Sequence, residues 1–69
     1  MNDHHVYKTV EITGTSTESP DHAIRVAIER ASVTIKNMRW FKVTETRGHI
    51  ENGTIAHWQV TIQLGFTLE

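Results

Sequence analysis

Two side chains in the second half of the chain have the chemistry of a binding site for a flat aromatic ligand. Trp40 offers a planar indole, and the strand pattern described below places it on a polar face, opposite a glycine. Stacking of such a ring contributes about 0.5–1.5 kcal/mol beyond the burial of its area. Gln59 falls on the same face and carries both a donor and an acceptor, as the edge of a heterocycle requires. The alternative is that Trp40 only seals a contact between subunits and that Gln59 is a solvated strand residue.

Residues for catalysis or metal binding are sparse by comparison. The chain has no cysteine, no Gly-x-Ser-x-Gly motif and no glycine-rich phosphate loop among its four glycines. His49 and His57 are predicted to lie on opposite faces of the sheet, and no histidine spacing matches a zinc site. We therefore predict no catalytic residue and no metal site.

The elements that would position Trp40 and Gln59 are the two strands of a β-hairpin. Over residues 56–68 the chain alternates between polar or small residues and an apolar set, Ala56, Trp58, Val60, Ile62, Leu64, Phe66 and Leu68. This is the period of a strand with one buried face. Residues 40–51 form a second run, rich in β-branched and aromatic residues, and the two runs flank Asn52-Gly53. That dipeptide suits a type I′ turn because both central residues need φ > 0, so we predict an antiparallel hairpin.

The register of this hairpin separates Trp40 from the core. Regular pairing from Glu51 and Thr54 joins Phe41 to Leu64, Val43 to Ile62, Glu45 to Val60 and Arg47 to Trp58 on the apolar face. On the polar face it joins Trp40 to Gly65, Lys42 to Gln63, Thr44 to Thr61 and Thr46 to Gln59. A slip of one residue would invert every side chain, so the register is strongly specified. Phe41 is then predicted to enter the core, with Trp40 on the other face.

The first half of the chain predicts a strand followed by a helix. Residues 6–13 alternate like a strand, and the small and polar residues 14–18 read as a loop. Ser19, Pro20 and Asp21 are typical of a helix start, and we expect the helix to run over 20–37 and to end at Asn37. Its apolar stripe is Ile24, Ala27, Ile28, Ala31 and Ile35. The prediction is an α+β fold of order β-α-β-β in a single domain, residues 1–69.

Charge and size limit the partners. Seven basic and eight acidic residues give a net charge of -1, which argues against nucleic acid. No apolar run spans a membrane and no signal peptide is read, so we expect a soluble cytoplasmic protein with no membrane partner.

The lengths of the predicted helix and the last strand do not match. The helix would span about 27 Å. The last strand would span roughly 50 Å, so one helix leaves a bare face and open edges. We infer an obligate oligomer.

Several segments resemble the dodecin family, and together they cover almost the whole chain. The resemblance rests on Val6-Tyr7-Lys8, Gly14-Thr15-Ser16, Trp40-Phe41, Arg47-Gly48-His49-Ile50, Ala56-His57-Trp58-Gln59-Val60 and Gly65-Phe66-x-Leu68-Glu69. It implies a three-stranded antiparallel sheet wrapped on one helix, assembled into a hollow homododecamer. It also implies non-enzymatic flavin binding, storage and buffering, with paired flavins stacked between symmetry-related tryptophans and their excited state quenched. The ligand implied is flavin mononucleotide (FMN), with riboflavin as the alternative.

The resemblance also assigns roles to single residues. Trp40 matches the stacking tryptophan, Gln59 the glutamine that hydrogen-bonds the isoalloxazine edge, and Arg47 a basic residue at the phosphate-bearing end. Thr67 stands at a cofactor-binding position where relatives often carry arginine, which weakens a phosphate clamp. Arg39 and Lys42 replace acidic residues of relatives and add positive charge nearby.

One distance conflicts with a site built from a single chain. In the predicted register Gln59 and Gly65 are six residues apart, so Gln59 and Trp40 of one chain lie about 20 Å apart. A flavin ring does not span this distance. Either a bulge and a curled sheet shorten it, or the two contacts come from different protomers, which we favour. The competing hypothesis is an oligomeric scaffold in which Trp40 only seals a subunit interface.

Overall fold

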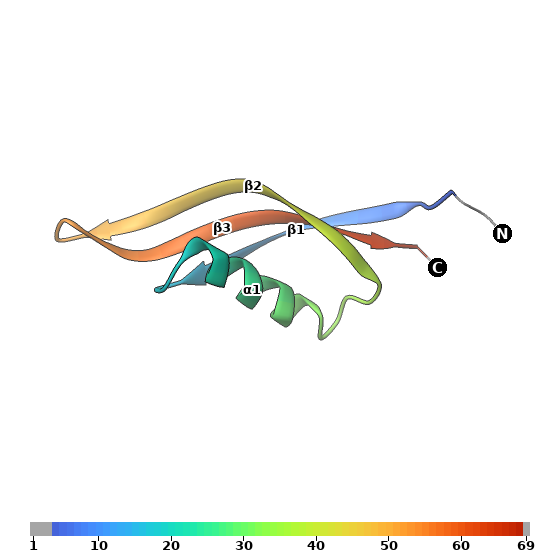
Figure 1. The fold of residues 1–69 in the computed structure, drawn as a ribbon, viewed down its shortest axis with the longest axis horizontal. Helices are drawn as coiled ribbons and strands as arrows, with labels where there is room; N and C mark the ends of the chain where they lie inside the picture. Colours follow the sequence, from blue (N-terminus) through green and yellow to red (C-terminus); the bar gives the residue numbers. More distant parts are fainter. Residues whose placement is uncertain (1–3, 69) are drawn as a thin grey trace.

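The structure, a computed structural model, describes residues 4–68 as one sheet with one helix against it. β1 (Tyr7–Ser16) is followed by α1 (Pro20–Ala31), and the hairpin strands are β2 (Met38–Glu51) and β3 (Thr54–Thr67). The strands pair antiparallel in the order β1-β3-β2, so β3 is central and α1 lies across one face (Figure 1). The predicted β-α-β-β fold is confirmed. The ends of the predicted domain, residues 1–3 and Glu69, lie outside the described residues.

The hairpin turn forms as predicted, and so does the pairing around Trp40. Asn52 and Gly53 both have positive φ, 53° and 77°, as a type I′ turn requires. Trp40 pairs with Gly65, and the neighbouring pairs predicted for Phe41, Lys42 and Val43 are also found. The start of β2 therefore carries its side chains on the faces that the sequence pattern indicated.

Further along β2, the predicted register is wrong. A bulge at Thr44, whose Oγ1 donates a hydrogen bond to the Thr61 carbonyl at 3.0 Å, shifts the pairing by one residue. Glu45 then faces Thr61 instead of Val60, Thr46 faces Val60 instead of Gln59, and Arg47 faces Gln59 instead of Trp58. The regular register would have aimed two charged side chains at the apolar face, which is costly without partners. A second irregularity, between His49 and Ile50, restores the pairing needed at the turn.

β1 is longer than predicted because its end lies directly beneath the helix. The expected loop over 14–18 is still strand as far as Ser16, with Gly14 paired to Val60. A Cβ atom at Gly14 would lie 2.9 Å from the Ala27 Cβ and would overlap the Ala23 carbonyl. Glycine is needed here for close approach of helix and sheet rather than for a turn.

α1 starts as predicted and ends six residues early. The Ser19 hydroxyl accepts a hydrogen bond from the His22 N–H at 3.0 Å, and Pro20 is the first helical residue. The helix ends at Ala31, and the β-branched residues Val33 and Thr34 continue only as turns. Asn37 does have positive φ, 63°, but it directs the chain into β2 instead of ending the helix.

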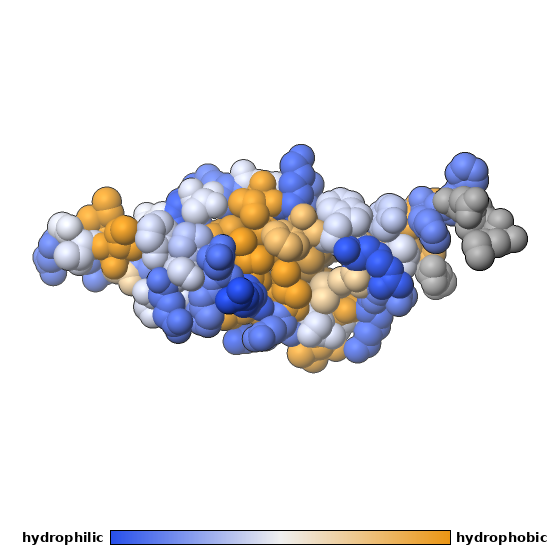
Figure 2. Space-filling model, viewed as in Figure 1, coloured by the Kyte–Doolittle hydropathy of each residue, from blue (hydrophilic) through white to orange (hydrophobic). Residues whose placement is uncertain are grey.

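The core lies between α1 and the middle of the sheet. Its buried members are Ala23, Ala27, Val60, Ile62 and Leu64. Ala23 was not part of the predicted stripe, whose isoleucines pack around it only partly buried. The helix covers β1 and β3 but not β2, so Phe41 and Val43 stay 45% and 42% exposed, against the expectation that Phe41 is buried. Figure 2 shows the apolar surface that results in the middle of the molecule.

Candidate functional site

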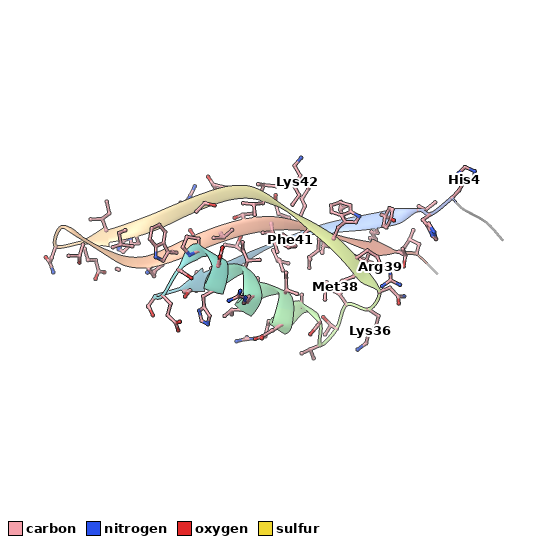
Figure 3. All side chains as sticks on the ribbon, viewed as in Figure 1. His4, Lys36, Met38, Arg39, Phe41 and Lys42 are labelled. Carbon is pink, nitrogen blue, oxygen red and sulfur yellow. The ribbon has the colours of Figure 1, made fainter. Side chains whose placement is uncertain are left out.

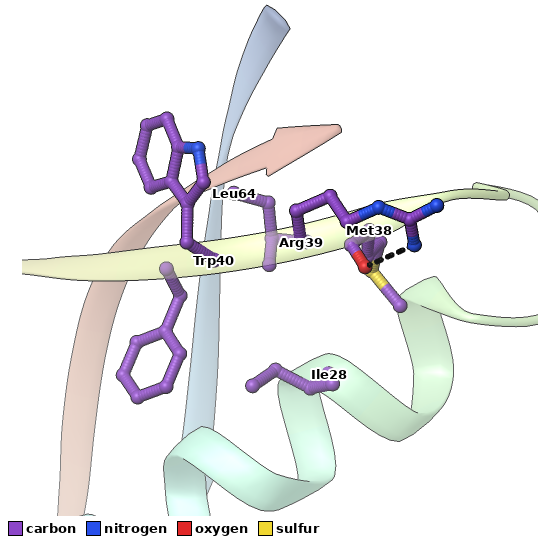
Figure 4. Close-up of a pocket in the computed structure, with 6 residues that line it drawn as sticks. Ile28, Met38, Arg39, Trp40 and Leu64 are labelled. Carbon is purple, nitrogen blue, oxygen red and sulfur yellow. Dashed lines mark hydrogen bonds between the residues drawn. The ribbon is translucent and has the colours of Figure 1, made fainter. Parts of the chain in front are cut away.

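Trp40 lies on the face of the sheet that carries no helix. The close-up in Figure 4 shows its indole on one side of β2 and the Ile28 side chain of α1 on the other. Figure 3 shows that the Lys42 side chain, two residues on, points away from α1, whereas Phe41 points toward it. The Trp40 side is therefore the outer face of the sheet, as the sequence pattern predicted, and 39% of the residue is exposed.

The indole lies directly over Gly65 of the central strand. A Cβ atom built at Gly65 would lie 2.6 Å from the indole Nε1 and closer still to two ring carbons. The ring therefore occupies the volume that any side chain at position 65 would need. Gly65 thus closes one side of the indole, while the residue as a whole keeps the partial exposure given above.

Tyr7 completes the surroundings of the indole, although the sequence pattern did not indicate it as a site residue. Its ring lies 6.0 Å from the Trp40 ring, centroid to centroid, at an interplanar angle of 68°, an edge-to-face arrangement. Strand alternation placed Tyr7 on the polar side of β1, but only the order β1-β3-β2 brings that side next to Trp40. This pairing of non-consecutive strands has no local sequence signal.

Thr67 lies near this aromatic pair and is buried. It pairs with Tyr7 across β1 and β3, and only 7% of it is exposed. Its Oγ1 has no hydrogen-bond partner within the part of the chain that the structure describes. The hydroxyl therefore remains free to donate or accept one hydrogen bond.

Arg47 and Gln59 form a second cluster on the same face. The bulge at Thr44 places them directly opposite each other, where side chains are in contact distance. The Arg47 guanidinium also bonds the Glu45 carboxylate at 3.0 Å, in an exposed ion pair. The structure thus joins two of the four predicted site residues that the regular register had put on opposite faces.

The two clusters lie at separate positions along β3. Arg47–Gln59 and Trp40–Gly65 are paired positions six residues apart on β3, which runs without a bulge between them. At about 3.3 Å per residue the separation is about 20 Å. The bulge at Thr44 lies in β2 and does not shorten it, so one chain does not bring Trp40 and Gln59 together.

The histidines next to the second cluster differ from the prediction. His49 pairs with His57 across the hairpin, and their rings stack with centroids 5.2 Å apart and planes 18° apart. The prediction of opposite faces is wrong because it lacked the bulge at Thr44. Among residues 4–68, no three or more His, Cys, Asp or Glu side chains are grouped as metal ligands.

A Ser-His pair elsewhere in the fold has a structural role. Ser16 Oγ lies 2.7 Å from His22 Nδ1, with the Glu18 carboxylate 3.8 Å from His22 Nε2. The same oxygen accepts hydrogen bonds from the backbone N–H groups of Glu18 and Ser19. With both lone pairs engaged and the residue buried, Ser16 fastens the loop before α1 and is not poised as a nucleophile.

A cavity on the helix side of β2 is less suited to a heterocycle. It has a volume of about 250 Å³ and is lined by Ile28, Met38, Arg39, Trp40, Phe41 and Leu64 (Figure 4). Arg39 donates a hydrogen bond to the Met38 carbonyl at 3.4 Å. Because these polar groups bond each other and the rest of the lining is apolar, the cavity offers little to orient a polar ring edge.

The part of the chain that the structure describes contains no helix with the length and apolar character needed to cross a membrane.

Comparison with known proteins gives one consistent result. A family model described as Dodecin matches residues 6–69. A protein described as dodecin from Thermus thermophilus is 44% identical over 64 residues, which cover 93% of each chain.

Two solved structures agree with this match. Dodecin from Streptomyces davaonensis superposes with a TM-score of 0.89 at 52% identity, over 94% of this chain and 96% of that one. Dodecin from Streptomyces coelicolor superposes with a TM-score of 0.91 at 48% identity, over 99% of this chain and 97% of that one.

Proposed function

The chain belongs to the dodecin family of small flavin-binding proteins, and we propose that it is a flavin store rather than an enzyme. The observation that carries this proposal is the Trp40 indole, which lies over Gly65 and is partly exposed on the helix-free face. Such a ring is a one-sided platform for a tricyclic ligand. Burying about 200 Å² of ligand ring contributes about 5 kcal/mol, to which stacking adds about 1 kcal/mol.

A one-sided platform needs a second surface, which a further copy of the chain supplies. The strip formed by Phe41 and Val43 and the edges of β1 and β2 are open to association. We propose a hollow homododecamer in which two flavins stack between tryptophans related by a twofold axis. Close stacking on indoles then quenches the excited flavin.

The remaining contacts come from the second cluster of another copy. Gln59 is proposed to hydrogen-bond the isoalloxazine edge, because about 20 Å along β3 separate it from Trp40 of its own chain. Arg47 is proposed to attract the phosphate, which favours FMN over riboflavin. Thr67 is proposed to lie beside the ligand without adding charge, because its side chain is neutral and its hydroxyl is buried. Such a store would work in the cytoplasm.

A titration of FMN fluorescence against the purified protein tests the function. We expect quenching that saturates at one flavin per chain, together with an assembly mass of twelve chains in light scattering. The competing scaffold hypothesis places Trp40 in a subunit contact, and the exposure of this tryptophan is the observation that favours it. It predicts the assembly with FMN fluorescence unchanged, and that result would exclude flavin storage.

A further inference from the structure

The aromatic pair of Tyr7 and Trp40 spans the whole width of the sheet. Tyr7 comes from β1 and Trp40 from β2, the two edge strands, with β3 between them. Neighbouring strands lie about 4.8 Å apart, so the backbones of β1 and β2 are about 10 Å apart. The two rings nevertheless approach to 6.0 Å. The indole, which lies over Gly65, therefore leans inward over the central strand.

Gly65 is what permits this approach. It is the residue of β3 that pairs with both Trp40 and Thr9, and a Cβ there would overlap the indole. Tyr7 lies two residues from Thr9 on β1, opposite Thr67, and reaches the indole diagonally. The indole thus has a floor of backbone and a wall formed by the Tyr7 ring.

We propose that Tyr7 is a positioning residue, which fixes the Trp40 indole in its place over Gly65 before a ligand arrives. An edge-to-face contact aligns the positive edge of one ring with the negative face of the other and so favours one relative orientation. Without that wall, an exposed indole on an edge strand would sample other rotamers. Ordering it on binding would then weaken affinity by about 3- to 10-fold.

This inference rests on flavin binding for its consequence but not for its geometry. The ring of Tyr7, and not its hydroxyl, makes the contact with Trp40. Tyr7→Phe is therefore the matched control, and Tyr7→Leu removes the ring while keeping an apolar side chain. Tyr7→Val, which favours a strand, is a second test if Tyr7→Leu does not fold.

The experiment uses the full chain with Trp58→Phe, so that Trp40 is the only tryptophan that absorbs and emits. We expect Tyr7→Leu to weaken the near-ultraviolet circular dichroism of the indole in the ligand-free protein. The Kd for FMN should rise about 3- to 10-fold. Tyr7→Phe should change the indole signal little and the Kd less than about twofold.

Each other outcome is decisive. An indole signal and a Kd both unchanged in Tyr7→Leu would overturn the proposal. A raised Kd with an unchanged indole signal would also overturn it, since Tyr7 would then act on the ligand directly. If the unmodified protein binds no FMN, the flavin function fails, while the indole signal of the ligand-free variants still decides the role of Tyr7.

Discussion

Each of the two tryptophans of the hairpin pairs with a glycine on the neighbouring strand, but the two indoles lie on opposite faces of the sheet. Trp40 on β2 pairs with Gly65, and Trp58 on β3 pairs with Gly48. The Trp40 indole lies on Gly65 itself, on the face without a helix, whereas Trp58 lies on the face that carries α1. A Cβ at Gly48 would lie 3.7 Å from Trp58 Cε3, an ordinary contact. A glycine opposite a tryptophan therefore does not by itself define a binding platform; the ring must also lie over that glycine and be exposed on the face without a helix.

Removing each ring in turn tests this difference most strongly. We expect Trp40→Ala to lower FMN affinity more than about 100-fold, because both the stacking and about half of the buried ring area are lost. Trp58→Phe should leave the Kd within about threefold. Fluorescence titration measures both, and light scattering checks that each variant still assembles.

Two outcomes would contradict the proposed difference between Trp40 and Trp58. Equal losses of affinity would mean that Trp58 also contacts the ligand. Loss of assembly in Trp40→Ala, with no effect on FMN fluorescence in the unmodified protein, would favour the scaffold.

The two glycines give a smaller contrast. Gly65→Ala inserts a methyl group where the indole lies, so we expect the indole to be displaced and FMN affinity to fall at least about 10-fold. At Gly48 the nearest atom to an added Cβ is the His57 carbonyl oxygen, at 3.5 Å. Gly48→Ala should therefore be tolerated, and lower chain entropy in the unfolded state should stabilise it by about 0.5 kcal/mol. Chemical unfolding and FMN titration of both variants check this, and a Gly65→Ala variant with unchanged affinity would show that the seat on Gly65 is dispensable.

The fold was predictable wherever one local signal dominated. Asn52-Gly53 set the turn, and alternation set the register as far as Val43. The helix end was not predictable, because the isoleucine at position 35 continues the apolar period while the chain has already turned. The strand character of Gly14 depends on its contact with Ala27, which only the packed helix creates.

The site was predictable in its residues but only partly in its geometry. The alternation of side chains along the strand was enough to place Trp40 on the outer face, because no irregularity separates it from the pairs around Phe41 and Val43. Beyond Thr44 one extra residue reversed the alternation and brought Arg47 to Gln59. Amino-acid composition says little about where a bulge lies. This bulge keeps charged side chains off the apolar face, and that reason is apparent only once the core is known. Tyr7 needed the strand order as well.

The two ends of the outer face also differ in charge, and this yields the smallest effect. At one end the aromatic pair carries no charge, whereas at the other Arg47 pairs with Glu45. If Arg47 attracts the phosphate, Arg47→Met should raise the Kd for FMN and leave that for riboflavin within about twofold. The guanidinium is 61% exposed and already paired, so its contribution is limited to about 1 kcal/mol, or about fivefold in Kd.

Arg47→Lys is the matched control, because it keeps the charge and should retain most of the preference for FMN. Salt provides an independent check, since an exposed charge contact is screened and a stack of rings is not. For the unmodified protein, the Kd for FMN should therefore rise with added sodium chloride, while the Kd for riboflavin stays nearly constant. The ratio of the riboflavin Kd to the FMN Kd then falls. If Arg47→Met weakens the binding of both flavins equally, Arg47 acts on the ring end together with Gln59. The phosphate must then be bound by other residues, and Lys42 and Arg39 near Trp40 are the next cations to replace.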